Sequence, residues 1–277
     1  MPLVHTREIV EQAAGRHGAG AFNVIQLEHA EAIVAGAEAA GAAVILQISE
    51  NCVAYHGALA PIGLATLAVA RAAAVPVAVH LDHATSDELV DEAVALGFGS
   101  VMYDGSRLPY RDNVAATARA VTRCHAAGVW VEAEFGEIGG KDGWHAPGAR
   151  TDPGAARSYA VATGADTLAV AVGSSHAMLT RDASLDLDLI KTLVAEVPVP
   201  LVLHGSSGVP DETLTAAVVR GMTKINIATR LNKAFTAAVR DRLAADPRLV
   251  DPRKYAAAGR DAISREVTHL LGVIKAA

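Results

Sequence analysis

Eight short β-type runs, each followed by a helix-type segment, constrain the fold of this chain more than any other feature of its sequence. Strict alternation of strand and helix implies right-handed crossovers and a parallel sheet. Eight such units close into a (β/α)8 barrel, and the 277 residues slightly exceed the ~250 that are typical of this fold. We therefore expect an α/β protein with one TIM-barrel domain over residues 1–277. The predicted strands are 21–24, 44–48, 77–81, 100–103, 129–134, 167–172, 201–203 and 224–227.

The apolar residues support this expectation. They make up 51% of the chain, whereas aromatic residues make up 4%. Ala, Val, Leu and Ile therefore carry the hydrophobicity, and these residues suit buried parallel strands and close-packed helices. Several predicted helices are followed by glycine, which is typical of a left-handed helix C-cap. The clearest helix-type segments are 27–40, 86–96, 113–127 and 153–163, and residues 1–18 contain a short amphipathic helix.

Charge and hydropathy indicate the cellular location of the protein and the kinds of partner that it has. The net charge of -6 is spread over both signs, so we expect no nucleic-acid partner. The first residues lack the basic and apolar regions of a signal peptide, and the apolar runs are shorter than the ~20 residues of a membrane span. We expect a cytoplasmic protein without a membrane partner. Its two cysteines, Cys52 and Cys124, are expected to be buried free thiols.

One segment departs from the compact pattern. Residues 136–152 follow the fifth predicted strand and are rich in glycine and polar residues. A loop of this length in a barrel is usually functional, because ordering it costs entropy while burying little surface. We interpret the segment as a mobile active-site loop.

Polar side chains are concentrated where the predicted strands end. Asp82 and His83 follow the third strand, Asp104 the fourth, Glu132 and Glu134 end the fifth, His176 follows the sixth, and His204 ends the seventh. In barrel enzymes the active site lies at the carboxyl ends of the strands. We therefore expect these side chains to converge on one rim.

Three neutral imidazoles bind a zinc-type ion and leave one coordination position open, which is what a Lewis-acid catalyst needs. Each histidine alone is more often structural; the pattern of His83, His176 and His204 at strand ends favours a metal site. Asp82 adjoins His83 and can move protons to and from a substrate hydroxyl. The alternative is that Asp82 caps the helix that begins near Thr85 or orients a histidine.

The last two strands are followed by loops of small residues, HGSSG and NIAT. Barrels commonly bind phosphate between these loops, where backbone amides point at the ligand. Residues after the second strand, Ser49, Glu50 and Asn51, face the same rim and are further candidates for substrate contact. The phosphate candidates are Gly205, Ser206, Ser207, Asn226, Ala228 and Thr229.

Several motifs together resemble one family over nearly the whole chain: AFN, HLDH, SVMYDGS, VEAEFGEIGG, AVGSSH, LVLHGSSG, KINIAT and DPRKY. The chain resembles the class II fructose-bisphosphate and tagatose-bisphosphate aldolases. The segments ARSYAVATGADTLAVAVG and TKINIATRLNKAF are similar to those of the tagatose-bisphosphate branch.

The resemblance implies a zinc-dependent lyase. It matches His83, His176 and His204 to the catalytic zinc ligands, Asp82 to the acid/base on the aldol hydroxyl, and Asp104 and Glu134 to acidic positions near the metal. A phosphorylated ketose would be cleaved reversibly, through a metal-stabilised enediolate, to dihydroxyacetone phosphate and an aldehyde. The family also implies Zn2+ or another divalent transition metal, a monovalent cation (Na+ or K+) beside the phosphate, and a homo-oligomer, dimer or tetramer.

The sequence departs from the family pattern at three places. Ala177 follows His176 where the family usually has glycine, which adds a methyl group at the phosphate end of the site. Lys141 and Trp144 stand in the loop where relatives carry acidic residues, and Arg230 follows NIAT where the family usually has an acidic residue. These changes bear on which substrate is accepted.

Of four other interpretations, the first is closed and the other three remain open. A Schiff-base aldolase needs a lysine at the end of the sixth strand; none is there, and Lys224 precedes the eighth strand and so should face the opposite rim. A barrel metallohydrolase usually needs an HxH pair on its first strand, where Phe22 and Asn23 stand instead. A same-fold aldolase for a different phosphorylated substrate and a non-catalytic sugar-phosphate binding protein are the remaining alternatives.

Overall fold

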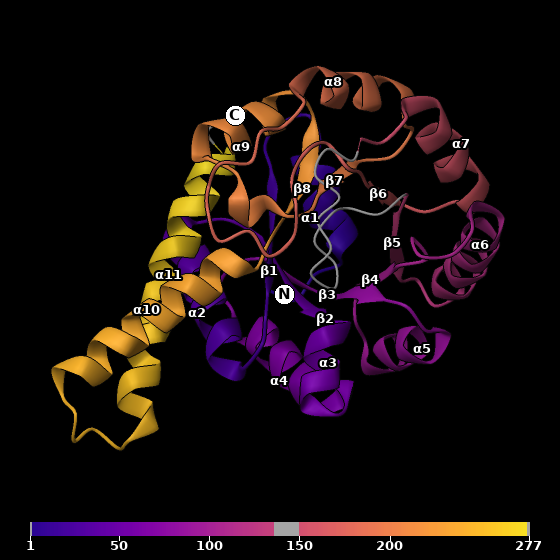
Figure 1. The fold of residues 1–277 in the computed structure, drawn as a ribbon. Helices are drawn as coiled ribbons and strands as arrows, with labels where there is room; N and C mark the ends of the chain where they lie inside the picture. Colours follow the sequence, from indigo (N-terminus) through magenta and orange to yellow (C-terminus); the bar gives the residue numbers. More distant parts are fainter. Residues whose placement is uncertain (1, 136–149, 276–277) are drawn as a thin grey trace.

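Eight parallel strands close into a barrel in chain order, with β8 returning to pair with β1 (Figure 1). The structure is a computed structural model and describes residues 2–135 and 150–275. It confirms the predicted TIM barrel. The strands are β1 (Ala19–Asn23), β2 (Val44–Ser49), β3 (Val77–Ala84), β4 (Ser100–Tyr103), β5 (Trp130–Glu134), β6 (Thr167–Ala169), β7 (Leu201–Leu203) and β8 (Met222–Ile227).

Helices surround the barrel (Figure 1) and bury their apolar faces against the outer side of the strands. Several end at glycines in the left-handed region, as the sequence predicts: Gly41, Gly97 and Gly164 have φ of 57°, 90° and 69°. The helices are α1 (Thr6–Ala13), α2 (Leu27–Ala40), α3 (Glu50–His56), α4 (Leu59–Ala72), α5 (Asp87–Leu96), α6 (Tyr110–Ala126), α7 (Pro153–Thr163), α8 (Leu187–Glu196), α9 (Asp211–Val219), α10 (Thr229–Ala245) and α11 (Pro252–Lys275), with a 3-10 turn η2 (Ser206–Gly208).

Four strand ends differ from the prediction by two or three residues. β1 begins at Ala19, β3 extends to Ala84, β8 begins at Met222, and β6 ends at Ala169. Apolar runs predict where a strand is buried, whereas hydrogen bonding to both neighbours decides where it begins and ends. The extension of β3 matters most, because it includes Asp82 and His83 in the strand rather than in the loop that follows.

The barrel interior is layered. Side chains at every second strand position face inward. At the amino-terminal end, Ala21, Ile45 and Ala78 form an apolar layer with Ile9 and Val10 of α1. This helix therefore closes the floor of the barrel, and it is the short amphipathic helix expected from the first residues. Polar side chains lie above the apolar layer, toward the carboxyl ends of the strands.

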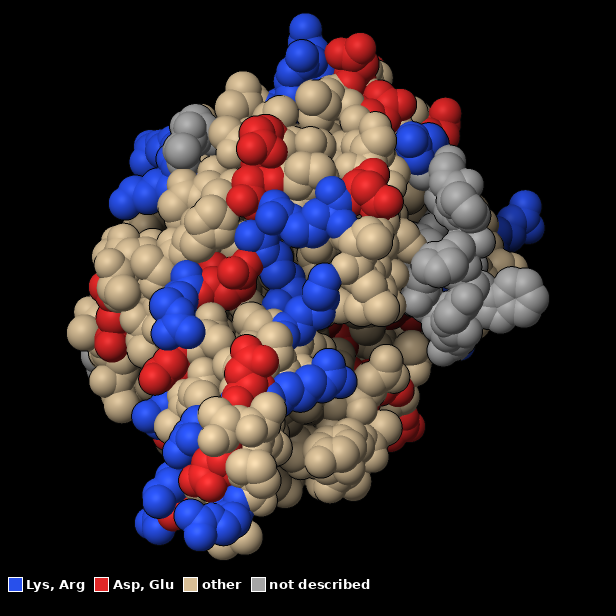
Figure 2. All heavy atoms as spheres, turned by 60° about the vertical axis from the view of Figure 1, so that its left-hand side comes forward, with Lys and Arg blue, Asp and Glu red and all other residues tan. Residues whose placement is uncertain are grey.

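Helices α10 and α11 lie side by side and project from the barrel (Figure 1). The barrel end of the pair is buried, with Leu231 and Leu271 in the core, whereas Val250 in the connection is 88% exposed. On the face that carries these helices, acidic and basic side chains are interleaved (Figure 2). Part of the C-terminal region is thus free of contact with the barrel.

Among the described helices, no single one has the length and apolar composition of a membrane span. Helices α3 and α4 reach both criteria only as a pair, and the two are bent by 113°. Within the pair, α4 buries Leu59, Ile62 and Leu67 in the core.

Both cysteines are free and buried, as expected. Burial raises the pKa of the Cys52 and Cys124 thiols to about 11. The thiolate is the reactive form of cysteine, so both thiols are protonated at neutral pH and act as small apolar side chains.

Candidate active site

β3 carries two adjacent side chains into the site, which a regular strand cannot do because neighbouring residues point to opposite sides. Asp82 follows the inward parity of Ala78 and His80. His83 breaks it with a φ of 54°, and the pairing of β3 with β4 shifts register between Leu81 and Ala84. The strand is therefore irregular at the point that the adjacent pair Asp82 and His83 requires, and this irregularity turns the His83 ring toward the barrel mouth.

The three predicted metal-binding histidines come together at the carboxyl end of the barrel. One nitrogen from each of His83, His176 and His204 lies within 4.8 Å of the other two. The ring centroids are 4.8 Å apart for His83 and His204, 5.3 Å for His83 and His176, and 5.5 Å for His176 and His204. His176 belongs to the loop after β6 and His204 follows β7. Three separate segments thus supply one group of imidazoles.

In two of these rings, one nitrogen contacts a carboxylate and the other faces the neighbouring histidine. His83 Nδ1 contacts Asp104 Oδ2 at 2.7 Å, and His204 Nε2 contacts Glu132 Oε1 at 2.9 Å. The opposite nitrogens, His83 Nε2 and His204 Nδ1, face each other at 3.1 Å. Burial, with a smaller effect of the neighbouring His83, lowers the pKa of His204 well below its ordinary value. A neutral imidazole is the form that binds metal, so the donor set fits a zinc-type ion.

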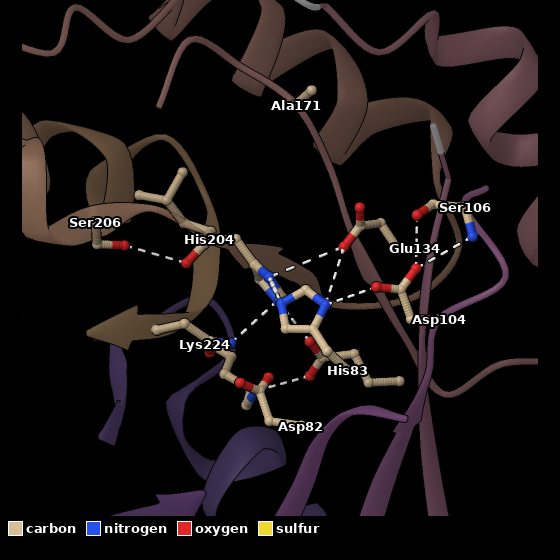
Figure 3. A network of polar contacts seen from close by, with 12 residues as sticks. Asp82, His83, Asp104, Ser106, Glu134, Ala171, His204, Ser206 and Lys224 are labelled. Carbon is tan, nitrogen blue, oxygen red and sulfur yellow. Dashed lines mark hydrogen bonds and ion pairs between the residues drawn. The ribbon is translucent and has the colours of Figure 1, made fainter. Parts of the chain in front are cut away.

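The two predicted acidic residues lie beside the histidines, as Figure 3 shows for His83, Asp104 and Glu134. Glu134 Oε2 is 3.7 Å from His83 Nδ1 and 4.0 Å from His204 Nδ1. Asp104 accepts hydrogen bonds from the Ser106 backbone amide at 3.1 Å and hydroxyl at 2.6 Å. His83, Asp104 and Glu134 also form a group of possible ligands within 4.8 Å. Asp104 contacts the His83 nitrogen that faces away from His204, so in this arrangement it orients the ring.

Asp82 lies at the edge of the histidine group and is held by a chain of amides. Gln47 Nε2 donates to Asn23 Oδ1 at 2.7 Å, and Asn23 Nδ2 donates to Asp82 Oδ2 at 3.2 Å. The other oxygen, Asp82 Oδ1, is buried without a hydrogen-bond partner in the described part of the chain. Helix α5 takes its cap from Ser86, so the capping role considered for Asp82 belongs to another residue. One carboxylate oxygen is left to exchange a proton with a ligand.

Asp82, His83 and His176 line a cavity of about 160 Å³ at the barrel mouth. The side of this cavity at which the sequence predicts phosphate binding is formed by the loops after β7 and β8. The Oγ of Ser207 accepts from the backbone amides of Ala228 at 3.3 Å and Arg230 at 3.1 Å, which joins the two loops. The lining residues are Asn23, Gln47, Ser49, Asn51, Asp82, His83, His176, Ala177, Gly205, Ser207, Asn226, Ala228 and Thr229.

Gly205 and Ser206 have different places in the HGSSG loop. Gly205 has a φ of +68°, and a Cβ there would lie 2.6 Å from the backbone of Ser175. Only glycine fits this approach of the loops after β6 and β7. Ser206 is buried and its hydroxyl donates to the carbonyl of Leu203 at 3.1 Å, so its side chain stabilises the turn beneath the cavity. Ser49 lines the cavity and also caps α3, through the amide of Cys52.

A larger cavity of about 470 Å³ lies at the amino-terminal end of the barrel, lined by residues that include His5, Arg7 and Trp130. Barrel enzymes place catalytic groups at the other end. Within the described residues, the three-residue groups suited to a metal also lie at that other end. The smaller cavity is therefore the candidate active site.

Comparisons with known proteins agree with this geometry. The family model of class II fructose-bisphosphate aldolases matches residues 4–277. The fructose-bisphosphate aldolase of Geobacillus stearothermophilus is 39% identical over 272 residues, covering 96% of this chain and 95% of its own. That of Thermus caldophilus is 39% identical over 293 residues with the same coverage. The crystal structure of the YdjI aldolase from Escherichia coli K12 superimposes with a TM-score of 0.87 at 29% identity, covering 98% of this chain and 97% of that one.

The chain belongs to the class II fructose-bisphosphate aldolase family. Membership confirms the predicted resemblance and makes the protein a lyase of the aldolase type. The family is metal-dependent, in agreement with the histidine group. The relatives named above are fructose-bisphosphate or YdjI aldolases, so the likeness to the tagatose-bisphosphate branch stays a prediction.

The expectation about Lys224 of this aldolase was wrong. Lys224 lies within β8, and its side chain is inside the barrel with Nζ 2.7 Å from Glu132 Oε2; it does not face the opposite rim. His80, which the sequence did not single out, is also buried inside the barrel, in β3 with Nδ1 2.7 Å from Ser100 Oγ. The inward parity of strand residues, counted from Asp82 and Asn226, is the signal that identifies both.

Arg230 of the aldolase also differs from expectation. Its guanidinium is directed away from the cavity and forms ion pairs with Asp211 at 2.8 Å and with Glu266. These ion pairs connect the start of α10 to α9 and α11. The guanidinium does not face the cavity. The other departures, Lys141 and Trp144, and the predicted active-site loop from residue 136 through residue 149 lie outside the described residues.

Ala177 combines backbone strain with a place in the cavity. Its φ is 58°, and a left-handed non-glycine residue costs about 1–2 kcal/mol. We expect Ala177→Gly to stabilise the aldolase by about 0.5–1 kcal/mol after the extra unfolded-state entropy of glycine, and to lower KM for a phosphorylated substrate because a methyl group leaves the cavity lining. Urea unfolding and steady-state kinetics measure both effects.

The control for this variant is Ala115→Gly at an exposed position inside α6. Here glycine relieves no strain, and we expect a loss of about 0.5–1 kcal/mol. Equal effects on stability at the two positions would contradict the argument from strain.

Proposed function

We propose that this class II aldolase reversibly cleaves a phosphorylated ketose, a ketose bisphosphate or a related sugar phosphate, to dihydroxyacetone phosphate and an aldehyde. The proposal includes a resident Zn2+, or another divalent transition metal, held by His83, His176 and His204. One observation carries it: three imidazole nitrogens lie within 4.8 Å of one another, and two of their rings, His83 and His176, line a cavity together with Asp82 and two small-residue loops.

At the end of the cavity where the carbon-carbon bond is cleaved, the metal-binding histidines and Asp82 have different roles. When bound, the divalent ion supplies Lewis-acid stabilisation of the negative charge that develops on the ketone side as the carbon-carbon bond breaks. Asp82 Oδ1 takes the proton of the hydroxyl that becomes the aldehyde oxygen and returns it in the synthetic direction. Asn23 and Gln47 hold the other oxygen of Asp82, so the proton is exchanged at a fixed position.

The phosphate end is proposed at the loops after β7 and β8. Helix α10 begins at Thr229, and a helix amino terminus favours an anion through its amides and dipole. A monovalent cation, Na+ or K+, is proposed beside the phosphate. The residues proposed to bind this end are Ala177, Gly205, Ser207, Asn226, Ala228 and Thr229, with Ser49 on the opposite side of the cavity.

Further proposals concern the whole molecule. We propose a homo-oligomer, dimer or tetramer, supported by the projecting α10 and α11 pair with Leu243 and Val250 exposed. The cytoplasmic location is proposed on the composition and charge of the sequence alone. The place of this chain in the tagatose-bisphosphate branch and the active-site role of residues 136–152 are proposed on the motifs alone.

The function is tested by incubating the metal-loaded protein with a panel of ketose phosphates and identifying the products. We expect one ketose to release dihydroxyacetone phosphate and an aldehyde, chelation to abolish the reaction, and Zn2+ to restore it. Borohydride added with substrate should trap no covalent adduct, since Lys224 is engaged by Glu132. A lysine adduct would contradict the mechanism. Binding of sugar phosphate without triose phosphate release would favour the non-catalytic alternative, and metal-dependent hydrolysis the metallohydrolase.

A further inference from the structure

Beneath the three histidines, the barrel contains an ion pair that the proposed reaction does not use. Lys224 Nζ of β8 lies 2.7 Å from Glu132 Oε2 of β5. The side chains are 1% and 2% exposed. Two charges are rarely taken out of water in this way, because their desolvation offsets much of their attraction. A contribution to the stability of the fold is therefore a weak explanation for this buried ion pair.

The other oxygen of Glu132 contacts a metal-binding histidine. Glu132 Oε1 lies 2.9 Å from His204 Nε2, so the same carboxylate joins the ammonium of Lys224 and the imidazole of His204. An ionised carboxylate only accepts hydrogen bonds. When His204 Nε2 donates to Glu132, the lone pair is left on Nδ1, the atom that faces His83 Nε2 at 3.1 Å. The side-chain amide of Asn226, which lies 3.0 Å from the same Nε2, then has to present its oxygen to this nitrogen.

A second ligand shows the same arrangement. His83 Nδ1 contacts the carboxylate of Asp104 at 2.7 Å, and the opposite nitrogen faces His204. Metal-binding histidines commonly donate their second N–H to a carboxylate, which fixes the tautomer and ring orientation. Glu132 thus contacts His204 in the same way as Asp104 contacts His83. It differs in being deep in the barrel, where an uncompensated negative charge would be costly.

We propose that Glu132 is a positioning residue for the metal ligand His204, and that Lys224 is present to compensate the charge of Glu132. The inference rests on the proposed metal site. Glu132 holds the His204 ring with its Nδ1 toward the ion and keeps the proton on Nε2. Lys224 fixes the carboxylate by binding its other oxygen. Neither residue touches the substrate.

The test separates positioning from stability with three variants: Glu132→Gln, Lys224→Met, and the two combined. Glutamine keeps the shape but donates as well as accepts, so it no longer imposes one His204 tautomer. It also leaves Lys224 buried without its counter-ion. The combined variant removes both charges and nearly preserves the volume. For each, we would measure the Tm of the chelated protein, the dissociation constant for Zn2+ by competition with a chromophoric chelator, and the visible absorption of the Co2+-loaded protein.

We expect Glu132→Gln to lower Tm and to weaken Zn2+ binding roughly 10- to 100-fold, the usual effect of losing a carboxylate partner of a metal-binding histidine. Lys224→Met should lower Tm with a smaller effect on Zn2+, because the carboxylate remains. In the combined variant Tm should recover, whereas Zn2+ binding and the Co2+ spectrum should stay altered. That separation of stability from metal binding is what a positioning role requires.

The matched control is Thr6→Val, which removes a buried hydroxyl contact in the same barrel, to Ser100 Oγ at 2.6 Å. It should lower Tm and leave Zn2+ affinity and the Co2+ spectrum unchanged. If the combined variant binds Zn2+ with the parent affinity and gives the parent Co2+ spectrum, the pair is structural and the inference is overturned. If the parent protein itself binds no divalent ion, the proposed function fails, and this inference fails with it.

Discussion

Replacing His176 or His204 by alanine is expected to abolish stoichiometric binding of Zn2+ and to reduce cleavage of the ketose at least about 1000-fold. The physical reason is that the ion contributes several kcal/mol of charge stabilisation in the transition state, and each ~1.4 kcal/mol corresponds to tenfold in rate. His176 lies on a loop and is partly exposed, whereas His204 is fully buried. His176→Ala is therefore the variant less prone to unfold, and metal content with product assay measures the effect.

The control is His125→Ala, because His125 is 44% exposed on α6 and pairs with Asp166 at the other end of the barrel. It should keep both Zn2+ and activity. Circular dichroism of the chelated proteins shows whether each variant folds. Stoichiometric, tight Zn2+ in a folded His176→Ala or His204→Ala variant would remove that residue from the set of ligands.

Asp82→Asn is expected to keep the metal and to lose about 10²- to 10⁴-fold in turnover, the usual contribution of a general acid/base. The amide has nearly the shape of the carboxylate and can still accept from Asn23, but it cannot take the hydroxyl proton. Exchange of the donor's α-proton with solvent requires no aldehyde hydroxyl. That exchange should therefore lose less of its rate than cleavage does, and the two rates are measured on the same metal-loaded sample.

Asp91→Asn is the matched control, since Asp91 is 61% exposed on α5 and its carboxylate contacts Arg123 away from the cavity. It should leave metal content and both rates unchanged. Full turnover by Asp82→Asn, or loss of its Zn2+, would assign Asp82 another role. A proportionate loss of cleavage and proton exchange would place its effect on the donor and not on the aldol hydroxyl.

Much of the candidate site was predictable from the sequence for one topological reason. In a parallel barrel the carboxyl ends of all strands meet at one rim, so polar residues at strand ends predict a common site without any contact being known. This reasoning brought His83, His176 and His204 together, with Asp82 beside them. The structure also contains the irregularity that the adjacent pair Asp82 and His83 requires, a φ of 54° at His83.

Residues that act across the barrel interior were harder to predict. Lys224 and Glu132 are 92 positions apart in the sequence and belong to β8 and β5. A sequence pattern gives the face of a strand on which each residue lies, but not which opposing side chain it meets. Arg230 is a similar case, because its partners Asp211 and Glu266 come from other helices.

By itself, the sequence determined the barrel, the end at which its chemistry lies, and the residues that gather there. Hydrophobic periodicity shows locally where each strand begins and ends. Because the parallel strands close into a barrel, the residues at their carboxyl ends all lie at one rim. Only the tertiary structure decided which nitrogens of His83 and His204 face each other, which oxygen of Asp82 is left for a proton, and that a lysine lies inside the barrel. Those outcomes depend on contacts of about 3 Å between side chains from distant strands, and no local pattern specifies them.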